Sequence, residues 1–387
     1  MSKEINFVGE ADRLISKMRT DIPVMFFKVA MIFIFLISGF ACTHQENTGG
    51  FSTSALTSPG DSVHFGSYIV YKIGDGVYKI CDPGKPGLKG GGLVGVDMYL
   101  VCGKEKALLI DLGNNYIDGY AGDLITPREN AKEEFLNVVH GLAGKLPLEV
   151  GVTHMHPDHS GMTKAFLGSD VPLWIGQGED MERLRTMHGI DPSVYQVFKQ
   201  GEKTFDLGGG RIIETFLVRG HSSGETVFLL KPDMMLFTGD AISPGPRRKR
   251  ELRSAEAFNQ FREDINKLVG YIIDNFAPYD RYRLQVYTGH SAEMIFHVTK
   301  TDVRDTMFED AGYGEWRFVQ DMANCVNGIA SGIWLDKANG WHHFEVAPGR
   351  NGEKQIQIVY FLGAVIIPEE VAYSVSGMEM PEVTSIR

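Results

Sequence analysis

Six consecutive residues behind a short apolar stretch contain four side chains that bind metal ions. They read His154-Met155-His156-Pro157-Asp158-His159, a His-x-His-x-Asp-His pattern. In extended backbone, side chains two residues apart point the same way, so His154 and His156 are able to bind one ion together. Asp158 and His159 follow on an expected loop, where the chain is able to turn toward a second ion. Imidazole and carboxylate together suit zinc, and iron or manganese also accept them.

Three further ligand-type residues each stand directly after a glycine, at the end of a predicted strand. They are His221 after the strand 212–218, Asp240 after the strand 234–238, and His290 after the strand 283–288. Glycine lets the backbone bend close to a bound ion, and sites in α/β folds gather at loops behind strand ends. We therefore expect one cleft to collect all seven residues. Several chargeable groups at an apolar strand end are costly to bury without a metal ion, which favours a metal site over separate structural roles.

This arrangement resembles the metallo-β-lactamase superfamily over roughly residues 66–300. The resemblance implies an α/β fold, a four-layer αβ/βα sandwich with its site at one edge of the sheets. It implies that one ion is bound by His154, His156 and His221, a second by Asp158, His159 and His290, and that Asp240 bridges them. Asp111, in the stretch Ile110-Asp111-Leu112-Gly113, matches an early family motif and would orient a ligand histidine from behind.

Departures from particular family members narrow the implied activity. Zinc β-lactamases lack a bridging Asp, so Asp240 disfavours penicillin hydrolysis. Diiron flavoproteins of the family have Glu where His156 stands, which disfavours that redox role. Homoserine-lactone hydrolases place a Tyr just past the bridging Asp, whereas Ala241-Ile242-Ser243 follows here. The pattern is most similar to the broad hydrolase group that includes thioesterases, lactonases and phosphodiesterases.

The resemblance therefore implies a dinuclear hydrolase with two divalent metal ions, zinc first and iron or manganese as alternatives. It would cleave an ester, thioester, lactone or phosphodiester bond of a small-molecule substrate through a metal-bridging hydroxide, which Asp158 and Asp240 hold. A mononuclear iron enzyme similar to sulfur dioxygenases is a second interpretation, and seven ligands argue against it. A surface binding lipoprotein with a structural metal site is a third, although structural zinc sites are usually closed and four-coordinate.

Strands and helices alternate around these residues in the way an α/β fold requires. The patterns predict two hairpins (68–73 with 77–80, and 98–102 with 107–110), helices at 131–144, 180–187 and 255–276, and further strands at 148–153, 171–175 and 226–230. Beyond residue 300 they predict helices at 302–308 and 315–329, then a hairpin of 344–347 with 355–361. We therefore predict a catalytic domain at 66–300. A C-terminal extension at 301–387 is expected to pack on this core and to form part of the cleft wall.

Two other groups of residues have competing interpretations. The basic run Pro246-Arg247-Arg248-Lys249-Arg250 either attracts an anionic substrate at the cleft rim or forms a solvated loop, and we favour the loop. Trp341-His342-His343 is either a second metal pair or a part of the C-terminal hairpin, and we favour the hairpin.

The N-terminal 41 residues resemble a bacterial lipoprotein signal. The apolar run from Val29 is about twelve residues long, which is short of the roughly 20 that a membrane-spanning helix needs. Gly39 and Ala41 are the small residues that a signal peptidase inspects, and Cys42 follows at once. We expect residues 1–41 to be removed and Cys42 to carry the lipid anchor. Residues 42–65 would then tether the enzyme to the bacterial cell envelope; a retained anchor or a buried helix is the alternative.

Composition agrees with a globular enzyme of this kind. The chain of 387 residues is 43% hydrophobic and 22% charged, which excludes a wholly disordered chain or a fibrous rod. The net charge of −11 weighs against nucleic acid as a partner, because such proteins usually present a basic face. Four cysteines are too few for a disulfide scaffold of this size.

Overall fold

The computed structural model describes most of the chain beyond residue 50. The described residues are 51–82, 95–119, 125–243, 247–248, 252–290, 314–335, 343–346, 348, 352–360 and 363–378. All of them belong to one compact unit, Thr48–Arg387. The predicted leader at 1–41 and the first part of the predicted tether lie outside the described residues, as does the helix predicted at 302–308.

The first sheet has eight strands whose order follows the sequence. These strands are β1 (Ser62–Phe65), β2 (Tyr68–Gly74), β3 (Val77–Asp82), β4 (Val96–Cys102), β5 (Ala107–Ile110), β6 (Leu148–Val152), β7 (Leu173–Gly176) and β8 (Tyr195–Phe198). Hairpins make β1 to β5 antiparallel, whereas β5 to β8 are parallel. Parallel neighbours need crossover connections, which contain α3 (Ala131–Ala143), α4 (Pro157–Ser160), the 3₁₀ turn η1 (Gly161–Phe166), α5 (Met181–His188) and the 3₁₀ turn η2 (Pro192–Val194).

The second sheet has six strands in the order β15-β14-β12-β11-β10-β9. Their bounds are β9 (Thr204–Asp206), β10 (Ile212–Leu217), β11 (Thr226–Leu230), β12 (Met235–Phe237), β14 (Gln285–Tyr287) and β15 (Gly314–Glu315). The chain crosses from β12 to β14 through α6 (Ala255–Asn275) and α7 (Pro278–Arg281), and these two strands are parallel.

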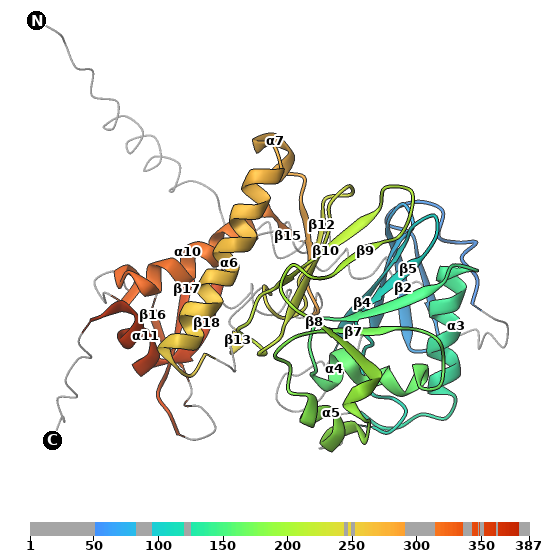
Figure 1. Ribbon diagram of the computed structural model, residues 1–387, viewed down its shortest axis with the longest axis horizontal. Coiled ribbons are helices and arrows are strands. Elements are labelled where there is room, and N and C mark those ends of the chain that lie inside the picture. Colours follow the sequence, from blue (N-terminus) through green and yellow to red (C-terminus); the bar gives the residue numbers. More distant parts are fainter. Residues whose placement is uncertain are drawn as a thin grey trace, which may run out of the picture. The chain divides into compact units, whose positions relative to one another are not determined.

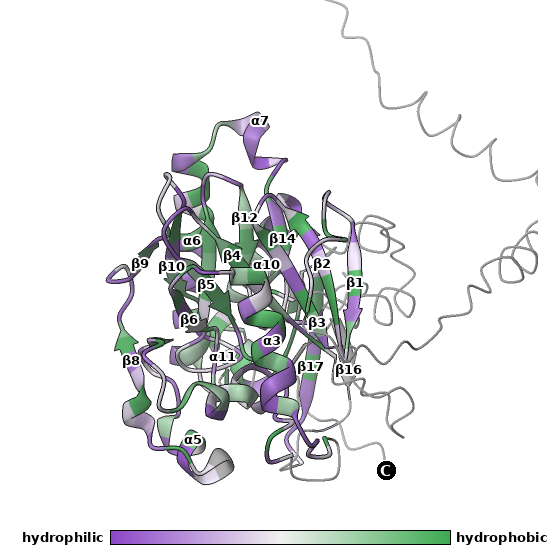
Figure 2. Ribbon diagram, turned by 90° about the vertical axis from the view of Figure 1, so that its right-hand side faces the viewer, coloured by the Kyte–Doolittle hydropathy of each residue, from purple (hydrophilic) through white to green (hydrophobic). Residues whose placement is uncertain are grey.

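Alternating side chains assign each face of the two sheets to a layer. In β4, Met98 and Leu100 join the hydrophobic cluster that contains the buried side of α3, whereas Tyr99 and Val101 join a cluster with Phe228 and other residues of the second sheet. The opposite face of the second sheet packs against α6. The order is therefore helices, sheet, sheet, helices, as predicted, and Figure 1 shows α3 beside the first sheet and α6 beside the second. The strands between the helix layers are mostly hydrophobic, as Figure 2 shows for β4, β5 and β12, whereas the short helix α7 is hydrophilic.

A third sheet of four strands lies in the C-terminal region, in the order β13-β18-β17-β16. It consists of β13 (Arg247–Arg248), β16 (His343–Val346), β17 (Gln355–Tyr360) and β18 (Gly363–Pro368), and it is accompanied by α10 (Trp316–Ala330), the 3₁₀ turn η3 (Ile333–Leu335) and α11 (Glu369–Ser376). Helix α10 contacts α6, β17 and β18, and these elements share one hydrophobic cluster with the outer face of the second sheet. The domain boundary at 300/301 stays a prediction, because residues 291–313 lie outside the described part.

Several local expectations are corrected by the structure. Arg247–Arg248 was expected in a loop, but its backbone pairs with Val365 and Ile366 of β18 and so forms a strand. Asp158 and His159 were also expected in a loop and instead lie in α4, because Pro157 suits the first helical turn and the carbonyl of His156 accepts the N–H of His159 at 2.9 Å.

Three cysteines in the described part, Cys81, Cys102 and Cys325, have free thiols. Burial raises the pKa of the Cys102 thiol to about 11 and that of Cys325 to about 12, so both stay protonated at neutral pH. Among the described helices, none has the length and apolar character needed to cross a membrane.

Candidate metal centre

Strand direction brings the sequence-predicted ligands to one edge of the two sheets. Asp111 follows β5, and the motif beginning at His154 follows β6, which is parallel to β5. In the second sheet, β10 and β12 are both antiparallel to β11 and therefore run in the same direction, and β14 is parallel to β12. His221, Asp240 and His290 follow these three strands and so emerge at the same end of their sheet.

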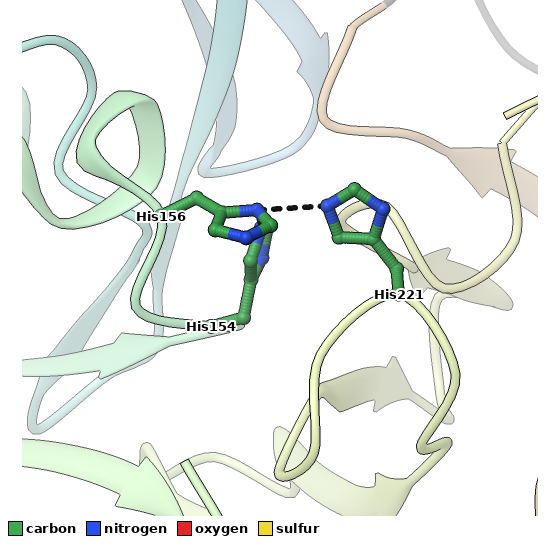
Figure 3. A group of neighbouring side chains, drawn as sticks. All are labelled: His154, His156 and His221. Atoms are coloured by element: carbon green, nitrogen blue, oxygen red, sulfur yellow. Dashed lines mark hydrogen bonds between the residues drawn. The ribbon is translucent and has the colours of Figure 1, made fainter. Parts of the chain in front are cut away.

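Three histidines form the first group of ligand atoms. His154 and His156 come from the loop behind β6, and His221 comes from the loop behind β10, as Figure 3 shows. His156 Nδ1 lies 2.8 Å from His154 Nε2 and 2.8 Å from His221 Nε2. All three side chains are buried. We call His154, His156 and His221 the first histidine group.

Asp158, His159 and His290 form a second group beside it. The Nε2 atoms of His159 and His290 are 3.2 Å apart, and Asp158 Oδ2 lies 3.3 Å from His290 Nε2 and 3.8 Å from His159 Nε2. The Asp158 side chain is 25% exposed, whereas His159 and His290 are buried. Asp158 is therefore the ligand-type group of this set that opens toward solvent.

Asp240 stands between the two groups, with one carboxylate oxygen toward each. Its Oδ2 lies 3.3 Å from Nε2 of His221 in the first group. Its Oδ1 lies 3.4 Å from Nε2 of His290 and 3.8 Å from Nε2 of His159 in the second group. This is the placement that a carboxylate bridging two ions requires.

The distances within these groups suit metal ions. Ligands at about 2.0–2.1 Å from a tetrahedral zinc ion lie about 3.3 Å from one another. The second group and Asp240 have separations of 3.2–3.8 Å, and ligand atoms of each cluster lie within 4.8 Å of one another. The first histidine group, at 2.8 Å, would have to open by about half an ångström around an ion.

Charge gives a second test of the fit. Four carboxyl groups surround the histidines, those of Asp111, Asp158, Asp240 and Glu225, and all but Asp158 are buried. Ionised, these groups carry a concentrated negative charge that two divalent cations would compensate. Buried charges need such compensation, so the residues present fit a pair of divalent ions.

Asp111 connects histidines of both groups. Its Oδ2 accepts the Nδ1–H of His159 at 2.8 Å and the hydroxyl of Thr153 at 2.9 Å, and its Oδ1 accepts the Thr153 N–H at 2.7 Å. Since the Thr153 hydroxyl donates to Asp111, it accepts from Nδ1 of His154, which lies 3.0 Å away. Both histidines are thereby held with Nε2 directed toward the centre, which is the role that the resemblance implied for Asp111.

Backbone groups position His290. Its Nδ1 lies 2.5 Å from the carbonyl oxygen of Gly95, so this nitrogen donates and Nε2 stays available to an ion. The preceding Gly289 is required by close packing, because a Cβ there would lie 2.5 Å from Cε1 of His159. Glycine is thus required here by packing against His159, whereas the sequence pattern suggested a bend of the backbone toward an ion.

Two glutamates at the site were missed by sequence reasoning. Glu225 is fully buried, and its Oε1 accepts the Asp240 N–H at 2.8 Å and lies 3.7 Å from Nδ1 of His154. Its place at the head of the apolar strand β11 was a signal that could have identified it. Glu179 follows β7 and bonds to the loops of the first histidine group. No local pattern distinguishes it from other loop glutamates.

Burial and mutual charge set the protonation of the metal-free cluster. Burial, reinforced by the other histidines, holds the pKa of His154 well below its usual value. For His159, burial lowers the pKa, but the carboxylates of Asp111 and Asp158 outweigh it and raise the pKa to about 10. Burial of Asp158 is likewise outweighed, by His159 and His290, and its pKa is lowered. His159 is therefore protonated at neutral pH until an ion displaces the proton.

Comparisons with known proteins found one matching family and several similar structures. Residues 91–316 match the family model described as the metallo-beta-lactamase superfamily. Metallo-beta-lactamase structures from Pontibacter korlensis (18% identity, 67% of this chain and 99% of that chain, TM-score 0.43) and Erythrobacter litoralis (16% identity, 59% and 92%, TM-score 0.42) are among the similar folds. A structure from Hirschia baltica is also similar (16% identity, 58% and 91%, TM-score 0.39). No curated protein sequence matches the chain significantly.

Proposed function

Because the chain belongs to the metallo-beta-lactamase superfamily, we propose that it is a dinuclear metal-dependent hydrolase. It holds two divalent metal ions, and we propose zinc as the metal. The placement of Asp240 carries this proposal, since its two oxygens lie 3.3 Å from His221 and 3.4 Å from His290. A carboxylate with one oxygen toward each group is the arrangement expected of a bridge between two ions. Bound in these groups, the ions would supply a nucleophile at neutral pH and polarise the scissile group of the substrate.

The residues of the chain divide the remaining work. Asp111, through His159 and Thr153, fixes the imidazole tautomers so that Nε2 faces the centre. Asp240 is 3% exposed and is suited to holding the ions together. Asp158, with a 25% exposed side chain, is the carboxylate that opens toward solvent and is placed to pass a proton to a leaving group.

We propose an ester, thioester, lactone or phosphodiester as the bond that is cleaved. All four present a polarisable C=O or P=O oxygen and a leaving oxygen or sulfur, which suits two-metal hydrolysis.

A substrate panel with metal-depleted and zinc-reloaded protein tests the activity. The panel contains small esters, thioesters, lactones, phosphodiesters and a β-lactam. We expect turnover of at least one of the first four classes, which falls to background after chelation and returns with zinc. Activity on the lactam alone, or oxygen consumption with an organic persulfide and no hydrolysis, would refute the proposed reaction.

We further propose that Cys42 carries the lipid anchor and that residues 1–41 are removed in a bacterial host. Small residues before the cysteine and the short apolar run from Val29 support this location. Mass spectrometry of the mature N-terminus is expected to show lipid-modified Cys42, and a Cys42→Ser variant is expected to leave the membrane fraction. An intact leader on the mature protein, or an unmodified Cys42, would contradict the proposal.

A further inference from the structure

The carboxylate of Glu179 joins the two loops that carry the first histidine group. Its Oε2 accepts the backbone N–H of Met155 at 3.0 Å. Its Oε1 accepts the backbone N–H of Gly224 at 2.9 Å and also the hydroxyl of Ser222. Met155 stands between the two histidines of one loop, and Ser222 directly follows the histidine of the other. One side chain is thus bonded to neighbours of all three histidines.

These two loops come from different sheets. The loop with Met155 follows β6 of the first sheet, the loop with Ser222 follows β10 of the second, and Glu179 follows β7 of the first. The separation of the histidine nitrogens across the site therefore depends on how the two sheet edges are held together. We propose that Glu179 is a positioning residue that sets this separation and thereby the affinity of the first histidine group for its ion.

The backbone at this junction is packed closely enough to hold the Glu179 side chain in place. A Cβ on Gly224 would lie 2.5 Å from the backbone nitrogen of Glu179 and 2.8 Å from the carbonyl oxygen of Gly176. Contacts that short leave no room for a side chain at residue 224. The turn at 176–179 and the loop at 222–224 are therefore in direct contact, and the carboxylate bonds extend this contact to Met155.

The bonds also require a carboxylate in particular. Both oxygens accept hydrogen bonds, one from Met155 and the other from Gly224 and Ser222. An amide of the same shape has one oxygen, so its NH₂ group would face a backbone N–H donor on one of the two loops. The Glu179→Gln variant therefore keeps the packing of the side chain but loses a hydrogen bond to one of the two loops. The Glu179→Ala variant loses both the packing and the hydrogen bonds.

The inference rests on the proposed dinuclear site, and its test measures zinc affinity for each half of that site. His290→Ala removes a second-group ligand, so its zinc binding reports the first histidine group. His221→Ala removes a first-group ligand, so its zinc binding reports the second group. Glu179→Gln and Glu179→Ala are introduced into each background, and zinc affinity of the metal-free proteins is measured by competition with a chromophoric chelator.

We expect both Glu179 substitutions to weaken zinc binding roughly 10- to 100-fold in the His290→Ala background, as loss of an outer partner of metal ligands does. In the His221→Ala background we expect less than about a twofold change. Glu182→Ala is the matched control, because Glu182 lies in the neighbouring α5 with a 64% exposed side chain and bonds to Arg185. It is expected to change neither affinity.

Three results would overturn the inference. Equal losses in both backgrounds would mean that Glu179 supports the fold in general. Full affinity in Glu179→Gln would mean that its packing suffices without the carboxylate. Unchanged affinity in Glu179→Ala would mean that the connection has no role. A parent chain that binds no zinc would instead refute the proposed function, so the two failures are distinguishable.

Discussion

The Asp240→Ala variant is expected to bind close to one metal ion per chain. Its rate of hydrolysis is expected to fall by roughly 100-fold or more. Two divalent cations repel strongly at about 3.5–4 Å, and the shared carboxylate offsets this repulsion. Its Oδ2 faces His221 at 3.3 Å and its Oδ1 faces His290 at 3.4 Å, so the substitution removes a carboxylate oxygen from the side of each group. Loss of one ion removes several kcal/mol of stabilisation of the transition state, and each 1.36 kcal/mol is a factor of ten in rate.

Elemental analysis of the purified variant, beside turnover on whichever panel substrate reacts, measures both effects. Asp274→Ala is the control, since Asp274 is exposed on α6 and belongs to none of the groups of ligand-type residues. His343→Ala is a second control, for the disfavoured metal pair His342-His343, because His343 begins β16 in the C-terminal sheet. Asp240→Ala with two ions and normal turnover would show that Asp240 does not bridge.

A chain that ends at residue 300 is expected to be insoluble or to lose its cooperative unfolding transition. The hydrophobic cluster on the outer face of the second sheet includes Phe261 and Leu268 of α6 together with Phe318 and Val326 of α10. Each fully buried large side chain contributes about 1.5–3 kcal/mol, and a domain has only about 5–15 kcal/mol of net stability. Uncovering several of them at once exceeds that margin.

The same truncation is expected to disturb the metal centre through α6. The buried Asp264 of α6 accepts hydrogen bonds from Arg219, at 2.7 Å from Nε and 2.7 Å from a terminal guanidinium nitrogen, and Arg219 stands two residues before His221. Truncation also removes β18, which pairs with β13.

Soluble yield, thermal unfolding followed by circular dichroism, and turnover check the truncation. A chain that ends at residue 378 retains α11 and is the control, expected to behave as the full chain does. A soluble, folded and fully active chain ending at residue 300 would show that the C-terminal elements are dispensable.

Residues close together in sequence, or directly behind strand ends, were the part of the site that could be predicted. His154, His156, Asp158 and His159 share one short motif, and strand direction explains why His221, Asp240 and His290 meet them. Their roles as ligands remain predictions until a metal ion is measured.

Contacts made only by tertiary packing could not be predicted in this way. Glu179 contacts Met155 and Gly224, 24 and 45 residues away, and no spacing in the sequence indicates such a meeting. Glu225 and Asp240 likewise meet only because two antiparallel strands, β11 and β12, lie side by side.

The fold shows a similar division. Strongly patterned elements such as α6 and the hairpin of β2 and β3 were predicted within a few residues of their bounds. The short strands β1, β8 and β9, and the strand β13, lack an alternating pattern of useful length and were missed. Strand β1 forms the end of the stretch 42–65 that was expected to be a flexible tether. Strand β18 is buried at all six residues, and a fully buried strand of this kind shows no alternation that would identify it.

Anomalous diffraction from a crystal of the zinc-loaded protein would locate the bound ions themselves. We expect two zinc peaks per chain, about 3.5–4 Å apart. One is expected beside the first histidine group, the other beside Asp158, His159 and His290, with Asp240 between them. A single peak bound by one group, with Asp240 turned away from it, would contradict the dinuclear centre and the hydrolase built on it.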